Sequence, residues 1–81
     1  MDMMETVVMM GSPDYKERLK AEYFQLKIRI EKLENMLNAW VAGALNFQPT
    51  CPYELLKAQL HAMKCYQHLL EERARIENIN L

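Results

Sequence analysis

Apolar residues recur in alternating steps of three and four along the first half of the chain. They are Leu19, Tyr23, Leu26, Ile30, Leu33, Leu37, Trp40 and Ala44. This spacing keeps the side chains on one side of an α-helix, where they form a seam for a partner helix. Upstream, "GSPDY" favours a helix start, because Ser12 can cap free amides, Pro13 suits the first helical position, and Asp14 suits the positive end of the dipole. We expect a helix from about residue 13 to 45.

The segment "GALNFQPTCP" separates this helix from a second one, which we expect from about residue 52 to 78. Gly43 and Asn46 loosen the first helix, and Pro49 ends it. Thr50 with Pro52 then starts the next helix. A connection this short places the helices antiparallel. The predicted fold class is all-α, an antiparallel helical hairpin domain over residues 13–81 that follows a short Met-rich N-terminal arm over residues 1–12.

The second helix carries more apolar surface than one partner helix covers. Its core-facing side is Leu56, Leu60, Met63, Tyr66, Leu70 and Ala74, and beside it lie Ala58, Ala62, Cys65, Leu69 and Ile76. The apolar arc is on the order of 200°, about twice that of an ordinary surface helix. The first helix has a weaker second stripe, Ala21, Phe24, Ile28 and Ala39. Exposing a large apolar side chain forgoes about 1.5–3 kcal/mol. We therefore expect a helical homo-oligomer whose interface contains Phe24, Ile28, Ala62, Cys65, Leu69 and Ile76.

Size and charge narrow the class of protein. The 81 residues suffice for one domain, and the formal net charge of −1, with acids and bases interleaved, argues against a nucleic-acid polymer as partner. The arm "MDMMETVVMM" is much shorter than the roughly 20 apolar residues of a membrane span. Cys51 and Cys65 lie in unlike contexts with no secretory leader before them, which favours free thiols. We expect a cytoplasmic protein without membrane contact.

One set of side chains on the second helix has ligand spacing for a metal. His61, Cys65, His68 and Glu72 follow one another in steps of four, three and four. A straight helix offers a metal only two or three convergent groups, and the chain has no second such cluster, so a solvated helix face is the favoured interpretation. Neither cysteine has a visible activating base, and two glycines cannot build a phosphate-binding loop. We expect no enzyme activity, cofactor or metal.

Aromatic and basic residues give a candidate ligand site. Tyr15 follows a helix start whose amides can receive an anion, and Arg18 and Lys20 lie within two turns of it. An aromatic ring beside a guanidinium or ammonium group is how proteins hold a nucleobase and its phosphate. Core packing is the favoured interpretation of Tyr23, Trp40 and Tyr66. The candidate ligand-binding residues are Tyr15, Arg18, Lys20, Arg29 and Phe47.

The segment "QLHAMKCYQHLLEER" resembles the second helix of small uncharacterised helical-hairpin proteins of tailed phages and prophages, including crAss-like phages of gut Bacteroides. The residues that carry the resemblance are Gln59, Leu60, Met63, Tyr66, Leu70 and Arg73, with Arg18, Glu22, Leu26, Ile30 and Leu33 in the first helix. It covers most of residues 15–76 and none of the arm. The chain departs from the family at "NFQPTCP", at Cys65 and at both histidines. The resemblance implies a phage origin, a hairpin fold and the cytoplasm of an infected bacterium.

Three functions stay open at this point. Small phage proteins of this architecture include inhibitors of bacterial immunity, some of them oligomeric sponges that sequester cyclic or cyclic ADP-ribose-type signalling nucleotides between subunits. By this analogy, the first hypothesis is a non-catalytic anti-defence sponge. The second is a protein-binding module that inhibits a host protein through the exposed apolar face of the second helix. The third is a structural hairpin that only assembles with itself.

Overall fold

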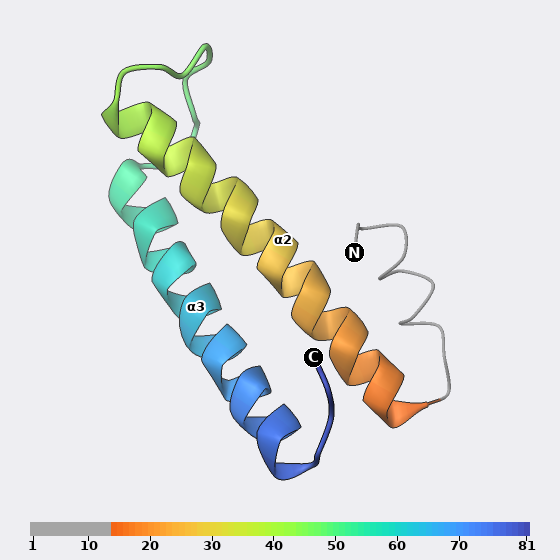
Figure 1. Ribbon diagram of the computed structural model, residues 1–81. Helices are drawn as coiled ribbons and strands as arrows, with labels where there is room; N and C mark the ends of the chain where they lie inside the picture. Colours follow the sequence, from red (N-terminus) through yellow and green to blue (C-terminus); the bar gives the residue numbers. More distant parts are fainter. Residues whose placement is uncertain (1–13) are drawn as a thin grey trace.

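The chain folds into two long antiparallel α-helices joined by one loop (Figure 1). The computed structural model describes residues 14–81. Helix α2 spans Tyr15–Val41 and helix α3 spans Tyr53–Ile76, and no strand is present among the described residues. The all-α hairpin predicted from the sequence is thus confirmed. The Met-rich arm predicted for residues 1–12 lies outside the described residues.

Asp14 forms the start of α2. Its backbone is extended (φ −72°, ψ 118°), and its side-chain Oδ1 accepts a 2.8 Å hydrogen bond from the backbone amide of Lys16. A carboxylate in this position satisfies one of the amides that a helix leaves without an internal partner. The sequence pattern assigned the cap to Ser12 and the first turn to residue 13, whereas the helix begins at Tyr15 with Asp14 as its cap.

The end of α2 lies four residues before the expected position near residue 45. Gly43 adopts φ +71°, its amide donates to the Trp40 carbonyl (3.0 Å), and the Ala44 amide donates to the Ala39 carbonyl (2.8 Å). These two bonds form a Schellman motif, which ends a helix at a left-handed residue. Gly43 therefore ends the helix, before Asn46 and Pro49 are reached. Ala44, predicted on the seam, is exposed.

The end of α3 uses the same motif. Asn78 adopts φ +57°, and the amide of Ile79 donates to the carbonyl of Ala74 at 2.8 Å. The reversal turns the Ile79 side chain back into the core, where it is buried beside Leu19 and Leu70. The helix was predicted to run to about residue 78, and nothing in its periodicity assigned Ile79 to the core. At the other end, α3 begins at Tyr53, directly after the predicted Thr50 and Pro52 start, and its N-cap residue Pro52 has no side-chain cap bond.

Two core clusters lie between the helices. The cluster near the chain ends is Leu19, Leu70, Ala74 and Ile79, with Tyr23 and Leu26 packed on it. The cluster near the loop is Ile30, Leu37 and Leu60, with Leu26, Leu33, Met36, Trp40, Tyr53, Leu56 and Met63 around it. Both predicted seams supply these clusters, and besides Ala44 one more seam residue is exposed. Tyr66 is 42% exposed, because it sits at the edge of the helix contact and its hydroxyl donates to Glu22.

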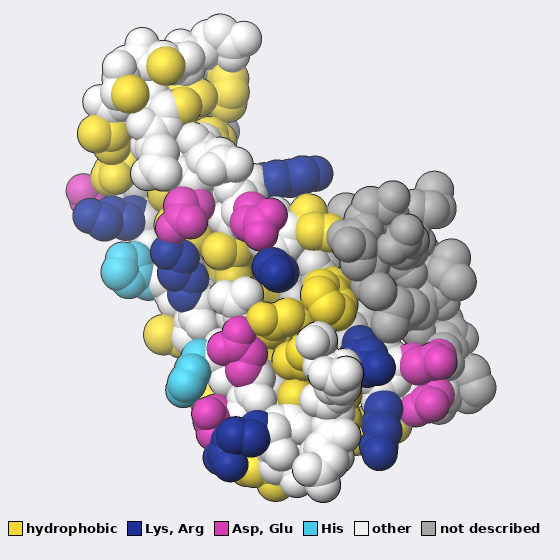
Figure 2. All heavy atoms as spheres, in the orientation of Figure 1, with side chains coloured by type: hydrophobic (Ala, Val, Ile, Leu, Met, Phe, Trp, Pro, Cys, Tyr) yellow, Lys and Arg dark blue, Asp and Glu magenta, His cyan; other side chains and the backbone are white. Residues whose placement is uncertain are grey.

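Polar side chains join the two helices along their edges. On one edge Lys64 Nζ lies 2.5 Å from Glu34 Oε2, and the Tyr23 hydroxyl donates to Glu71 at 2.8 Å. Figure 2 shows acidic and basic side chains interleaved along the face that it draws. Partial burial, then the hydrogen bond to Glu71, raises the pKa of Tyr23, and the hydrogen bond to Glu22 is the main cause of the raised pKa of Tyr66. These phenols therefore favour their protonated form in the folded chain.

The residues predicted to form an oligomer interface lie on two different outer faces. Ala62, Cys65, Leu69 and Ile76 are exposed on α3. Phe24 and Ile28 are half-buried on α2, and Ala21 on the same stripe is fully buried. Because the helices face each other through their seams, their outer faces point in opposite directions. The exposed members of the predicted interface are thus all on α3.

Neither α2 nor α3 contains a stretch that is long and apolar enough to cross a membrane.

Candidate functional site

A groove runs between the two helices near the loop. Its first part, about 440 Å³, is lined by Arg29, Lys32, Leu33, Met36, Leu56, Gln59 and Met63. Its second part, about 370 Å³, is lined by Met36, Phe47, Gln48, Pro49, Thr50, Cys51 and Leu56. The two parts adjoin, because Met36 and Leu56 line both. We call them together the loop-end groove.

Helical spacing brings the lining residues of each helix into one row. On α2, Arg29, Lys32 and Met36 follow in steps of three and four, beside the seam that faces α3. On α3, Gln59 and Met63 repeat the step of four. The rows come together because Leu33 of α2 and Leu56 of α3 pack against the same core cluster. The groove is therefore a consequence of hairpin packing.

The groove has an apolar floor, a cationic end and an aromatic end. Its floor is Leu33, Met36, Leu56 and Met63, and Met side chains adapt to irregular shapes. Arg29 and Lys32 of α2 lie at one end, and Gln59 of α3 lines the same part of the groove. At the other end lies the Phe47 ring, which is 55% exposed. Hydrophobic side chains are visible on the surface of this loop end in Figure 2.

The two cations of the groove are not used by the ion pairs of the hairpin. Between residues 14 and 81, the ion pairs join Lys64 to Glu34, Arg73 to Glu77 and Arg75 to Glu72. Arg29 and Lys32 belong to none of them. Two cations beside an apolar floor suit a ligand with an anionic group at one end and a planar or apolar part at the other.

The structure divides the five predicted ligand-binding residues between two ends of the hairpin. Arg29 and Phe47 line the loop-end groove. Tyr15, Arg18 and Lys20 lie in the first two turns of α2, at the end of the hairpin opposite the loop (Figure 1). The sequence therefore predicted two of the groove residues together with three that lie far from them.

Sequence reasoning did not find Lys32, Met36, Gln59 and Met63 as groove residues. A helical projection places Lys32 next to the seam, since it follows Arg29 by three and precedes Leu33. That signal was present. That Lys32 and Gln59 line the same hollow depends on the register between two helices, which no local pattern contains.

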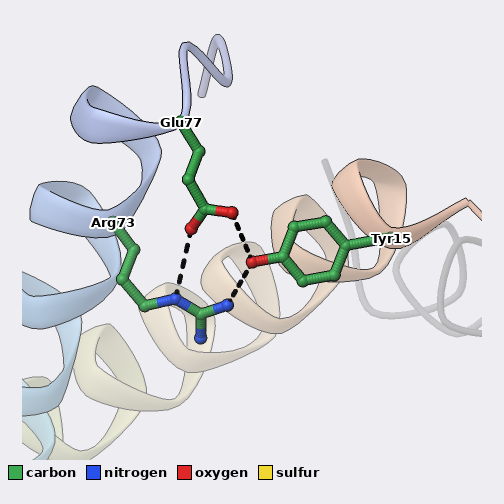
Figure 3. Close-up of polar contacts among 3 residues, drawn as sticks. All are labelled: Tyr15, Arg73 and Glu77. Atoms are coloured by element: carbon green, nitrogen blue, oxygen red, sulfur yellow. Dashed lines mark hydrogen bonds and ion pairs between the residues drawn. The ribbon is translucent and has the colours of Figure 1, made fainter.

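Tyr15 belongs to a contact that closes the open end of the hairpin (Figure 3). Its hydroxyl donates to Glu77 Oε1 at 2.6 Å and accepts from Arg73 Nη2 at 2.5 Å. Arg73 Nε lies 3.5 Å from Glu77 Oε2, and the guanidinium lies 5.8 Å from the Tyr15 ring centroid. The side chain of Tyr15 thus ties the start of α2 to the end of α3.

The candidate metal ligands do not converge. Among residues 14–81, no group of three or more His, Cys, Asp or Glu side chains is arranged to hold a metal ion. His61 and Glu72 are separated by about 16 Å along α3. Glu72 accepts from Arg75 Nη2 at 2.8 Å, and that hydrogen bond, with the Arg75 charge, lowers the pKa of Glu72. Cys51 and Cys65 are exposed free thiols.

A family model described as Sequestin matches residues 13–76 of the chain. The matched segment contains the whole of α2 and α3. The chain belongs to the Sequestin family. No curated protein and no solved structure matches it. The name Sequestin is consistent with sequestration of another molecule.

Proposed function

We propose that this Sequestin-family protein is a non-catalytic phage accessory protein that inhibits bacterial immunity. In this proposal it binds and sequesters a nucleotide-type signalling molecule, a cyclic nucleotide or a cyclic ADP-ribose-type messenger, in the cytoplasm of the infected host. The observation that carries the proposal is the loop-end groove, in which Arg29 and Lys32 face an apolar floor that ends at an exposed aromatic ring.

Each part of a nucleotide has a counterpart in the groove. Arg29 can bind phosphate oxygens with two parallel N–H donors, and Lys32 adds a point charge beside it. Phe47 offers an exposed face on which a base can stack, which is worth about 1–3 kcal/mol per base. Gln59, Gln48 and Thr50 supply hydrogen-bonding groups. Together they distinguish a nucleotide from a simple anion.

Sequestration requires tight binding and about as much protein as messenger, and it requires no catalysed reaction. A phage protein that lowers the free concentration of a messenger has to hold it intact. Cations, an aromatic ring, amides and a hydroxyl group are suited to holding such a ligand.

The test is a thermal-shift and calorimetric screen of the purified chain against cyclic dinucleotides and cyclic ADP-ribose isomers. A ligand that binds only the folded state raises the melting temperature. We expect one class to do so, and the ligand to be recovered unchanged after heat denaturation. The Arg29→Gln, Lys32→Gln double variant should lose the shift, whereas Lys20→Gln, at the other end of the hairpin, should keep it. No shift from any messenger, or recovery of a cleaved product, would overturn the proposal.

A protein-binding module is the second candidate, favoured by the exposed Leu55, Leu69 and Ile76 on α3. It predicts that a stoichiometric host protein is retained on the immobilised chain. Substitutions of Leu55, Leu69 or Ile76 should release that protein, whereas substitutions of the groove residues should not. The third candidate, a structural self-assembling hairpin, predicts an oligomer that binds neither. The groove cations favour the first.

A further inference from the structure

The outer face of α3 carries an apolar row that the hairpin does not cover. Leu69 is 58% and Ile76 69% exposed. The row runs in steps of three and four along the helix, on the side opposite the core-facing residues, and it contains one acidic position. The residues of the row are Leu55, Ala58, Ala62, Cys65, Leu69, Glu72 and Ile76. All of them are exposed apart from the acidic residue, Glu72, which is half-exposed. We call it the α3 strip. Its spacing is that of a coiled-coil seam.

We propose that the α3 strip of one copy packs antiparallel against the α3 strip of a second copy, about a two-fold axis near Cys65. The order of side-chain sizes favours this direction. Ala58 and Ala62 lie before the centre of the row and Leu69 after it. An antiparallel pair places Leu69 of one copy against these small residues of the other, so the layers interlock. A parallel pair would oppose Leu69 to Leu69 and leave gaps between facing alanines.

The charges along one edge of the α3 strip are complementary only when the helices are antiparallel. Glu54, His61, His68 and Arg75 repeat every seven residues along this edge, and all are exposed. Antiparallel packing places Glu54 of each copy beside Arg75 of the other, and two-fold symmetry makes this contact twice. In a parallel pair, Glu54 meets the uncharged Gln59 of the second copy.

The other edge of the α3 strip borders the loop-end groove. It carries Gln59, Tyr66 and Arg73, again seven apart, and Gln59 also lines the groove. In the antiparallel pair, Tyr66 lies near the axis and Arg73 of the second copy lies next to Gln59. The second copy thereby brings Arg73, which also contacts Tyr15 and Glu77 of its own chain, to the groove edge and converts an open groove into a pocket between subunits. The dimer does not depend on the proposed function, whereas this role of Arg73 rests on it.

Sedimentation velocity of the full chain, from low to high micromolar concentration, tests the association. We expect a dimer, and a monomer for Leu69→Glu with an unchanged helical circular dichroism spectrum. Val41→Glu is the matched control, because Val41 is 73% exposed but lies on α2, outside the strip. Ala62→Arg serves if Leu69→Glu loses helicity. A wild-type chain that stays monomeric at high micromolar concentration, or a Leu69→Glu chain that stays dimeric, would overturn the proposal.

Charge reversal tests the direction of packing. Glu54→Arg and Arg75→Glu should each weaken the dimer several-fold, and the double variant should restore it. The two positions are about 30 Å apart along one helix, so the restoration has to occur between copies. If the double variant is weaker than either single variant, the antiparallel arrangement is wrong.

Ligand binding by the dimer and by Leu69→Glu tests whether the second copy completes the pocket. Leu69 lies outside the groove lining, so its substitution acts on binding only through the dimer. Because the monomeric variant lacks Arg73 of a second copy, it should bind the messenger identified in the screen at least tenfold more weakly. If the wild-type dimer and the Leu69→Glu variant bind with equal affinity, Arg73 of the second copy is not part of the site. If neither protein binds any messenger, the proposed function fails, whereas the dimer is still decided by sedimentation.

Discussion

At the scale of single residues, adjacent side chains of the same type differ sharply in burial. Leu69 and Leu70 are adjacent, yet Leu70 has no exposed surface and packs with Leu19 and Ala74, while Leu69 faces solvent. Most of the stability that one side chain provides here therefore depends on which side of α3 it occupies.

Leu70→Ala should lower the free energy of unfolding by about 2–5 kcal/mol, the usual cost of a cavity in a packed core. A domain of this size has little more stability than that to lose. Urea denaturation followed by circular dichroism measures it. Val41→Ala, at an exposed position of α2, should change the value by less than about 0.5 kcal/mol. Equal effects of the two substitutions would contradict the core assignment.

The tyrosines at the helix edges predict a loss of stability in alkali. Tyr23 and Tyr66 have a raised pKa in the folded chain, so the unfolded chain loses these protons first, at its pKa of about 10. Their contribution is complete below that pH and declines as the pH rises through the folded-state pKa. Unfolding midpoints measured on both sides of pH 10 should fall less in the Tyr23→Phe, Tyr66→Phe double variant than in the wild type. Parallel curves would refute the assignment.

At the scale of elements, both helices are ended by left-handed residues. Gly43 and Asn78 take positive φ values, and the amides that follow them bond back to carbonyls of the last turns. These ends decide where the loop begins and how the chain returns to the core. The end of α2 at Val41 also frees Phe47 from the helix and leaves it at the groove.

Gly43→Ala should destabilise the chain by about 1–2 kcal/mol, the cost of a left-handed conformation for an L-residue. No atom lies within 4 Å of the added Cβ, so the cost comes from the backbone alone. Gly43→Asn should cost less, because Asn adopts this conformation more readily. Thermal unfolding of the three proteins gives the order. An alanine variant as stable as the wild type would show that the loop rearranges.

At the scale of the whole molecule, the two ends of the hairpin have different tasks. The Tyr15, Arg73 and Glu77 contact joins the chain ends, while the loop end holds the groove with Arg29, Lys32 and Phe47. Within one copy, substitutions at one end should therefore leave the properties of the other end unchanged.

Tyr15→Phe removes the hydroxyl that bridges Arg73 and Glu77 and keeps the ring. We expect a loss of at most about 1 kcal/mol, because the contact is exposed. Hydrogen exchange near Ile79 should become faster. In the monomeric Leu69→Glu background, where no second copy reaches the groove, Tyr15→Phe should leave messenger affinity unchanged. A drop in affinity without faster exchange would instead place Tyr15 in the ligand site, as the sequence suggested.

The sequence by itself determined the two helices, their antiparallel packing and most of the core. The seam from Leu19 to Trp40 and its counterpart from Leu56 to Ala74 are local patterns, because helical periodicity alone decides which side chains share a face. The α3 strip was also visible, since Ala62, Cys65 and Leu69 follow the same periodicity.

Only the tertiary structure decided which residues of one helix meet which residues of the other. The groove needs Lys32 of α2 and Gln59 of α3 at the same hollow, Ile79 enters the core after a left-handed turn, and Tyr66 leaves the seam for Glu22. Each of these depends on the register and crossing of two helices. Register is set by the sum of packing contacts between segments far apart in the chain, and no local pattern records that sum.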